Sequence, residues 1–313
     1  MLINELLGIK YPIIAGAMHG ISDGAFAASV SNAGGLGIIA TGGFTLDEIK
    51  EEIIKCKKLT NKPFGVNVFM LSPIVNEIVD IIISLKVKIV TTGAASSFSI
   101  IKRLKSEGIM VFPVTSSVVL AKRMARLGVD GIICEGMESG GHVGYDTTMT
   151  LIPRMAEALD IPIIAAGGIG YGSSLLSAII MGASGIQVGT ILLASKEASI
   201  HENYKKIIIN AKDNDTVILG SGLDRVRVYK NKAAKEYLES SDKSLGDMNR
   251  VKLAIKDGDI DNGIFIMGEI AGAIKEVLPI KEIFEKIIND AILIEGDFIS
   301  NISKLKECEW NVI

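Results

Sequence analysis

Short apolar runs alternate with longer amphipathic runs along the first two thirds of the chain. The apolar runs cover residues 12–18, 35–41, 64–69, 88–93, 110–116, 131–136, 162–168 and 185–190. Runs of this length that are apolar on both faces are typical of buried parallel strands. Between them lie predicted helices, several of which begin at Ser or Thr and end at Gly: residues 46–59, 72–85, 96–108, 118–128 and 173–182.

Each step from strand to strand takes roughly 20 to 30 residues, the length of a βα unit. Eight such units predict an α/β fold of the (β/α)₈ TIM-barrel type over residues 1–199, and the strand count disfavours the alternative of a doubly wound open sheet. Beyond the eighth run the sequence is charged and helix-forming, without further strand patterns. We therefore predict that residues 200–313 form a helical extension packed on the barrel, with a loop near 239–250.

Composition narrows the function classes. The chain has 313 residues, 48% of them hydrophobic, which suits a barrel with buried strands. A net charge of −3 gives no general attraction to nucleic acid. Residues 161–195 carry no charge, but their glycines and Pro162 divide them into short pieces, so we predict no membrane span. Three widely spaced cysteines and the lack of a secretory leader predict a reduced, cytoplasmic protein.

The active site of a TIM barrel lies at the carboxyl ends of its strands. Two of these ends, AAGGI after the seventh strand and QVGT after the eighth, offer unobstructed backbone N–H groups just before a helix. This pattern favours a phosphate site, because amides and the helix dipole attract anions. The alternative is that the glycines only let strand and helix pack closely. Other polar or small residues also fall at strand ends: Gly16 to His19, Asn67, Thr91 to Gly93, Thr115 and Glu135.

His142 is one of only three histidines, and it lies in the glycine-rich stretch EGMESGGHVGYDTTM, residues 135–149. The stretch follows the sixth strand, so we predict a loop above the barrel mouth. A lone histidine is more often structural than catalytic. Here, however, the flanking glycines would let the backbone approach a ligand, and the imidazole could act as acid, base or hydrogen-bond donor beside a phosphate-bearing cofactor.

Other candidate chemistry is weaker. GLGIIA, residues 35–40, matches a dinucleotide fingerprint, but the match is the predicted strand itself rather than a turn after it. His19, His142, Glu135 and Cys134 lack metal-ligand spacing, so we predict no metal site, and a buried Cys134 would be inert. The basic run RVRVYKNKAAK, residues 225–235, would ordinarily be a solvated helix face. It could also bind the extra phosphate of NADPH or an acidic partner protein.

Several motifs together resemble the flavin-dependent enoyl-acyl-carrier-protein reductases of the FabK type and the related nitronate monooxygenases. They include YPIIAGAM, SNAGGLGIIATGG, KPFGVNVFML, GIICEGMESGGHVG, IPIIAAGGI and GASGIQVGT. The resemblance is dense over residues 1 to 235 and weaker at 261–274. It implies an FMN-binding TIM barrel with His142 as the catalytic residue. The implied cofactor contacts are Ala17, Met18, Asn67, Thr91, Glu135, Ala166, Gly167, Gly168, Gln187, Gly189 and Thr190.

Within that set, the resemblance puts Ala17, Met18 and Asn67 at the flavin ring, and the four residues 167, 168, 189 and 190 at the phosphate. This sequence departs from the family's usual residues at three positions: Ala15, and His19 and Glu269, which the resemblance places on the substrate side. The resemblance favours a reductase that uses NADPH or NADH to reduce the trans-2 double bond of enoyl-acyl-carrier-protein thioesters in fatty acid synthesis. It also implies a small-molecule or carrier-bound acyl substrate and a homodimer.

Two alternatives remain open. The first is a nitronate monooxygenase, which oxidises alkyl nitronates with O₂. The second is a flavin-binding protein without turnover, against which the intact GGH motif argues.

Overall fold

The computed structural model describes residues 1–93, 97–240 and 248–306, and within them the eight predicted strands form one parallel sheet. Its order is β1-β9-β8-β6-β5-β4-β3-β2, and a parallel bridge from Ile14 to Leu36 joins the two ends. The predicted TIM barrel is therefore confirmed. The strands are β1 Ile13–Ala15, β2 Gly37–Ala40, β3 Phe64–Phe69, β4 Ile89–Gly93, β5 Met110–Thr115, β6 Ile132–Glu135, β8 Ile163–Ala166 and β9 Gly185–Val188.

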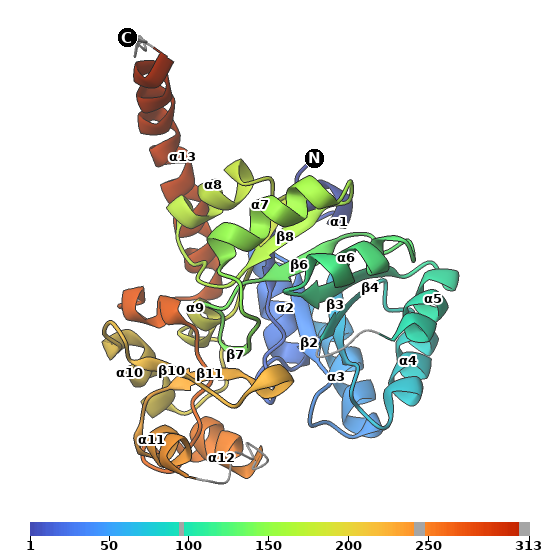
Figure 1. Cartoon of the computed structure of the whole chain (residues 1–313). Coiled ribbons are helices and arrows are strands. Elements are labelled where there is room, and N and C mark those ends of the chain that lie inside the picture. Colours follow the sequence, from blue (N-terminus) through green and yellow to red (C-terminus); the bar gives the residue numbers. More distant parts are fainter. Residues whose placement is uncertain (94–96, 241–247, 307–313) are drawn as a thin grey trace.

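Helices follow the strands around the outside of the barrel (Figure 1). Their ends carry the expected caps: Thr45 and Glu48 form a capping box on α3, and α2 ends at Gly34 with φ +105°. These helices are α2 Gly24–Ala33, α3 Leu46–Leu59, α4 Val75–Ser84, α5 Phe98–Ser106, α6 Val118–Ala125, α7 Thr148–Ala158, α8 Gly172–Ile180 and α9 Thr190–Leu193. A further helix, α1 Ile3–Leu7, precedes β1.

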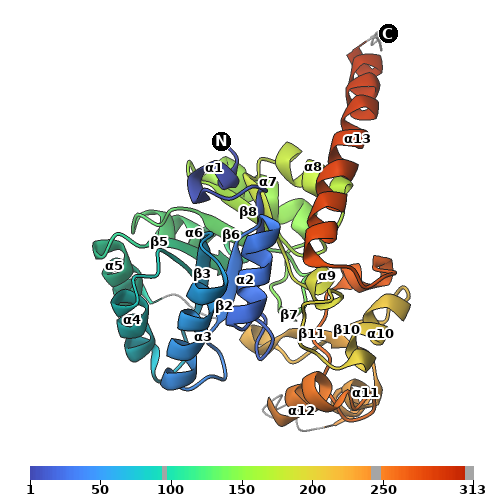
Figure 2. The ribbon, with the colours of Figure 1, turned by 180° about the vertical axis from the view of Figure 1, so that it is seen from behind.

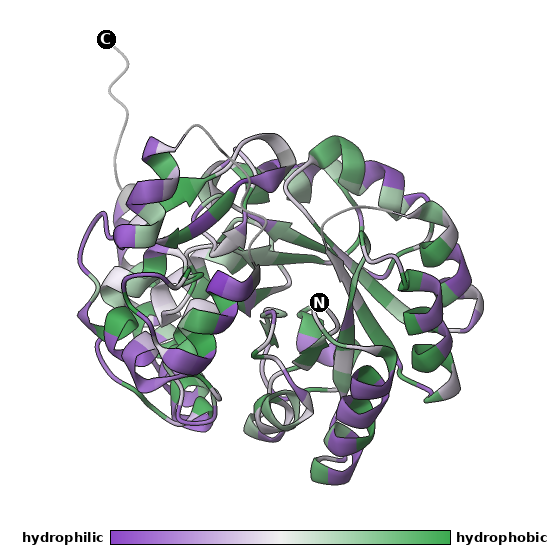
Figure 3. Cartoon of the chain, turned by 90° about the horizontal axis from the view of Figure 1, so that it is seen from below, coloured by the Kyte–Doolittle hydropathy of each residue, from purple (hydrophilic) through white to green (hydrophobic). Residues whose placement is uncertain are grey.

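Two apolar cores result from the alternation of side chains along each strand. One fills the barrel interior and includes Ile14, Phe112 and Ile133, with Ile3 and Leu7 of α1 in the same cluster. The larger core lies between the barrel and its helices, where Cys134 and its neighbours pack. Figure 3 shows this arrangement from below, with hydrophobic strands inside a ring of helices whose outer faces are hydrophilic.

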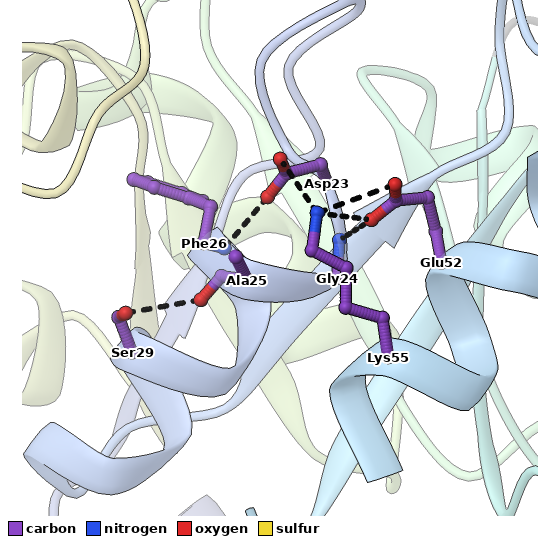
Figure 4. Close-up of polar contacts among 7 residues, drawn as sticks. All are labelled: Asp23, Gly24, Ala25, Phe26, Ser29, Glu52 and Lys55. Atoms are coloured by element: carbon purple, nitrogen blue, oxygen red, sulfur yellow. Dashed lines mark hydrogen bonds and ion pairs between the residues drawn. The ribbon is translucent and has the colours of Figure 1, made fainter. Parts of the chain in front are cut away.

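Polar contacts at the start of α2 join this helix to α3 (Figure 4). The Gly24 amide donates to Glu52 on α3 at 2.7 Å, and Asp23 caps α2 through the Phe26 amide at 2.7 Å. Lys55 lies 3.5 Å from Asp23 and 3.2 Å from Glu52. A Cβ atom at Gly24 would lie 2.1 Å from the Glu52 carbonyl oxygen, so only glycine allows this approach.

The extension is not purely helical, so the prediction of no strands beyond the eighth run is wrong. Strands β10 Thr216–Leu219 and β11 Val226–Tyr229 pair antiparallel and extend to β7 Gly141–His142. Both runs are only four residues long, and Arg227 interrupts the second, VRVY, which pairing with the distant β7 stabilises. The other elements are α10 Glu202–Asn210, η1 Gly222–Asp224, α11 Lys232–Glu239, α12 Met248–Lys252, η2 Leu253–Asp257, η3 Glu269–Ala273 and α13 Ile280–Lys306.

The long α13 packs against α8 through its first part and then projects from the body, as Figure 2 shows from behind. None of the helices in the described residues is both long enough and apolar enough to traverse a lipid bilayer. Part of the predicted loop at 239–250 lies outside the described residues, as does Cys308.

Candidate active site

The inner wall at the carboxyl end of the barrel carries several of the predicted cofactor contacts. Asn67 on β3 and Thr91 on β4 stand opposite each other in the sheet, and the Asn67 amide donates to the Thr91 hydroxyl at 2.9 Å. Since Ile89 faces the barrel interior, Thr91 two residues later faces it too. This bond orients the Asn67 amide and leaves its carbonyl oxygen free for other partners.

Glu135 continues this inner wall on β6, opposite Ala166 on β8, which in turn lies opposite Gln187 on β9. Ile133 belongs to the interior core, so Glu135 points to the same side and Cys134 to the other. Burial raises the pKa of Glu135 to about 7, and the nearby Ser139 hydroxyl opposes that rise. A carboxyl group that titrates near neutrality therefore faces the mouth.

The turn after β8 is closely packed. Gly167 and Gly168 have φ values of +100° and +70°, which favour glycine. A Cβ atom at Gly167 would lie 2.9 Å from the Gly136 carbonyl oxygen and from the Thr148 hydroxyl. That hydroxyl also lies 2.9 Å from the Gly167 carbonyl oxygen and from the Glu138 carboxylate. For Gly167, close packing alone is a sufficient reason for glycine.

The turn after β9 is different. Gly189 has φ −124°, which any residue adopts, and a Cβ atom there would meet nothing within 4 Å. Neither conformation nor packing requires glycine at this position, so its missing side chain keeps a space open beside the barrel mouth. Thr190 is buried, and its hydroxyl accepts a hydrogen bond from the Gly268 amide at 2.9 Å. This open space fits the predicted phosphate cradle.

The loop after β1 brings Ala17, Met18 and His19 to the same end of the barrel. The Met18 amide donates to the Ser22 hydroxyl at 2.9 Å. The His19 ring packs over the turn after β2, where a Cβ atom at Gly43 would lie 2.3 Å from its ring. Burial, followed by the positive charge of Lys252, lowers the pKa of His19. His19 is therefore a neutral, packed imidazole at neutral pH.

The sequence predicts that His142 lies in a loop, but the structure places it in a strand. It belongs to the two-residue strand β7, opposite Val226 of β11, so the extension supplies its backbone partner. Its side chain is exposed. Desolvation by the surrounding protein still lowers the pKa of the imidazole, and the Asp224 carboxylate opposes that shift. At neutral pH the exposed imidazole is therefore mostly neutral.

The residue that sequence reasoning missed is Arg227 on β11, which is only 4% exposed. The basic run 225–235 is thus not a solvated helix face: its first part is a strand, and one of its cations is buried. Arg227 pairs with Glu269, the predicted substrate-side residue, at 2.8 Å, and the Glu269 side chain is half exposed. The alternating pattern VRVY was the signal that could have revealed this strand.

Metal and thiol chemistry find no support in the residues that the structure describes. No group of three or more His, Cys, Asp or Glu side chains in those residues could hold a metal ion. Cys134 is buried, and burial raises the pKa of its thiol well above the ordinary value. A protonated thiol in the helix-side core is not a nucleophile.

The fold and the residues at this mouth define a TIM-barrel protein whose candidate active site lies at the carboxyl ends of its strands. The sequence model of the family described as Nitronate monooxygenase matches residues 1–80 and 75–290, and this chain belongs to that family. FabK from Thermotoga maritima has a similar solved structure, with a TM-score of 0.90 and 36% identity over 97% of this chain and 98% of that one.

Two curated relatives are similar in sequence. One, from Staphylococcus aureus (strain MSSA476), is named "Probable nitronate monooxygenase" and is 34% identical over 262 residues, 69% of this chain and 74% of the relative. The other, from Rhodococcus jostii (strain RHA1), is named "(3aS,4S,5R,7aS)-5-hydroxy-7a-methyl-1-oxo-octahydro-1H-indene-4-carboxyl-CoA dehydrogenase". It is 34% identical over 216 residues, 69% of this chain and 61% of the relative.

Proposed function

We propose that this protein is an FMN-dependent reductase that uses NADPH or NADH to saturate the trans-2 double bond of an enoyl thioester, either free or carried by acyl carrier protein. The observation that carries the proposal is the similarity to FabK along nearly the whole chain. The Rhodococcus relative, whose name describes a CoA thioester dehydrogenase, supports a thioester as the substrate class. Fatty acid synthesis is the pathway that this activity would serve.

The residues at the mouth fit a flavin mononucleotide. The space beside Gly189 suits the phosphate, and the inner wall at Asn67, Thr91 and Glu135 offers hydrogen-bonding groups for a polar ring edge. FMN, when bound, supplies two-electron redox chemistry between a nicotinamide and an electron-poor double bond. The protein's part is to hold the cofactor, orient the thioester and manage one proton.

His142 is our candidate for the residue that orients the thioester and supplies the proton. Its lowered pKa keeps the imidazole neutral at pH 7, so one ring nitrogen donates a hydrogen bond, which can hold a thioester carbonyl oxygen. Its exposure keeps the imidazole in proton exchange with solvent, so the proton for the α carbon comes from the imidazolium form, which returns to the neutral imidazole and is regenerated by solvent. Overall, the substrate gains two hydrogens, one from NAD(P)H as hydride and one as a proton.

A nitronate monooxygenase is the second candidate, favoured by the family match and by the Staphylococcus relative. An anaerobic titration of the yellow, flavin-loaded protein separates the two. For the reductase we expect NADPH or NADH to bleach the flavin absorbance and an enoyl thioester to restore it. Bleaching by an alkyl nitronate but not by either nucleotide would instead establish the monooxygenase. Turnover of neither substrate would favour a binding protein.

Replacing the candidate catalytic residue gives a second test. His142→Ala should keep its FMN, because its side chain is not part of the predicted cradle, and should lose about 100-fold or more in kcat. The control is His201→Asn, which removes a histidine that caps α10, at its Asn203 amide, rather than one at the mouth. Unchanged turnover in His142→Ala would remove the role assigned to this imidazole.

A further inference from the structure

The chain segment that carries His142, residues 137–144, is fastened to the extension. Gly141 and His142 pair with Arg227 and Val226 of β11. The Val143 amide donates to the Arg225 carbonyl oxygen at 3.0 Å, and the Arg225 guanidinium donates to the Gly144 carbonyl oxygen at 2.7 Å. We call residues 137–144 the His142 segment.

Arg227 is the buried centre of this attachment. Its Nε and Nη2 both donate to the Met137 carbonyl oxygen, at 3.1 and 2.9 Å, where the His142 segment begins. Its Nη1 donates to the Thr216 hydroxyl at 3.0 Å and lies 2.8 Å from the Glu269 carboxylate. Burying a guanidinium is costly unless its donors are satisfied, and these contacts satisfy them on three sides.

Further hydrogen bonds connect this attachment to the turn after β9. The Glu269 amide donates to the Glu138 carbonyl oxygen at 3.0 Å, so residue 269 holds the His142 segment through its backbone and Arg227 through its side chain. The preceding residue, Gly268, donates its amide to the Thr190 hydroxyl. Two hydrogen bonds, the peptide bond between residues 268 and 269, and the Arg227–Glu269 ion pair therefore connect Thr190 to Arg227 and the His142 segment.

We propose that Arg227, together with Glu269, is a positioning residue that sets where His142 stands relative to the open cradle at Gly189 and Thr190. Arg227 acts through the Met137 carbonyl, not by touching substrate. The kinetic consequence of this proposal rests on the proposed function, but the placement of the His142 segment does not. We call the Arg227–Glu269 pair the clamp. Glu269, which the sequence predicted to face substrate, is therefore one of its two residues.

Lysine cannot replace this arginine. A guanidinium is a planar fork that serves Met137, Thr216 and Glu269 at once, whereas an ammonium is a point charge on a flexible stem. Arg227→Lys therefore keeps the charge near Glu269 but loses part of the geometry. Arg227→Met loses both, and Glu269→Gln keeps the shape of the partner but removes its charge.

The experiment compares Arg227→Lys, Arg227→Met and Glu269→Gln with the control Lys230→Met, which removes an exposed cation from the same run. For each flavin-loaded variant we would measure kcat, KM and FMN affinity. We expect kcat to fall about 100-fold in Arg227→Met, by an intermediate factor in Arg227→Lys and a few-fold in Glu269→Gln, because small misplacements of a catalytic group are costly. KM and FMN affinity should change less than threefold, and the control should match the parent.

Two further readouts do not depend on turnover. Hydrogen exchange of the backbone amides of the His142 segment should quicken in the three variants and not in the control. The chain has only three histidines, so NMR can follow the His142 imidazole directly. Its titration should shift in the same order as kcat. The charged groups that face Arg227 are Glu269, Glu138 and Arg225, and Asp224 faces His142. Apart from Glu269 in Glu269→Gln, the variants leave all of these charges in place.

The clamp is refuted if exchange and the His142 titration stay at parent values in Arg227→Lys and Glu269→Gln, or if the variants lose FMN rather than kcat. Should Arg227→Met not fold, those two milder variants decide the matter. If the parent protein reduces no enoyl thioester while exchange quickens as expected, the proposed function fails and the clamp stands.

Discussion

The turns after β8 and β9 look alike in sequence, since both place glycine between a buried strand and a helix, but the structure uses their glycines differently. Gly167 has a left-handed backbone and no room for a Cβ atom. Gly189 has a negative φ, which other residues also adopt, and free space around it. The first glycine is explained by packing within the protein. Neither packing nor φ explains the second, which is the position where we propose the phosphate.

This difference distinguishes two explanations for a glycine in such a turn, close packing and a phosphate site, which the sequence motif alone does not distinguish. At Gly167 the neighbours are Gly136 and Thr148, so the turn after β8 anchors the start of the stretch that leads to His142. At Gly189 the neighbour is open space at the barrel mouth. We therefore expect the two positions to respond in opposite ways to the same added methyl group.

The largest effect should follow from Gly167→Ala. Alanine at a left-handed φ costs about 1–3 kcal/mol, and the clash with the Gly136 carbonyl adds to it. The Tm of the cofactor-free protein should fall by about 5–10 °C. Differential scanning calorimetry measures this directly. A Tm within one degree of the parent protein would mean that the turn is not as tightly packed as its geometry indicates.

Gly189→Ala should show the opposite pattern and a smaller effect. The cofactor-free Tm should stay close to that of the parent, because the methyl group has room and φ is negative. FMN affinity should fall about tenfold, or about 1.4 kcal/mol, because the methyl group occupies the proposed phosphate space. Quenching of flavin fluorescence on binding gives the Kd. Unaltered affinity would move the phosphate away from this turn.

The last prediction concerns Glu135, whose strand neighbour Ala166 leads into the crowded turn after β8. Its pKa is about 7 in the folded protein, against an ordinary value of 4.5. The folded protein thus binds this proton more tightly than the unfolded chain does. The stability from the protonated form is complete below pH 4.5 and is lost as the pH rises through 7.

Glu135→Gln has no such titration, so its cofactor-free Tm should gain on that of the parent protein between pH 5 and pH 8. The comparison is a pair of thermal melts at each pH. Parallel pH profiles for the two proteins would show that Glu135 is better solvated than its position in the barrel indicates.

The barrel could be predicted well because its signals are local and repeated. Each strand is a short apolar run, and the cap at Gly34 and the capping box at Thr45 mark helix ends in the sequence itself. The strand ends then pointed to Asn67, Glu135 and the glycine turns, and the structure brings these to one end of the barrel. The cofactor contacts themselves stay predictions until FMN binding is measured.

The extension was predicted less well for a physical reason. β10 and β11 are four-residue strands with charged neighbours, and a signal as short as VRVY carries little weight beside the longer helical patterns around it. The partner of β11, β7, lies 84 residues earlier in the chain, counted from Val226 to His142. The burial of Arg227 is equally a product of distant neighbours, none of which lies beside it in the sequence.

The sequence by itself determined the eight βα units, the end of the barrel at which chemistry occurs, and the histidine to test, because strand periodicity and turn residues act over a few neighbouring positions. Only the tertiary structure decided why each glycine is present, that β7 carries His142, and that Arg227 joins His142's segment to Glu269. Those outcomes depend on free space, burial and partners from distant parts of the chain, which local pattern does not encode.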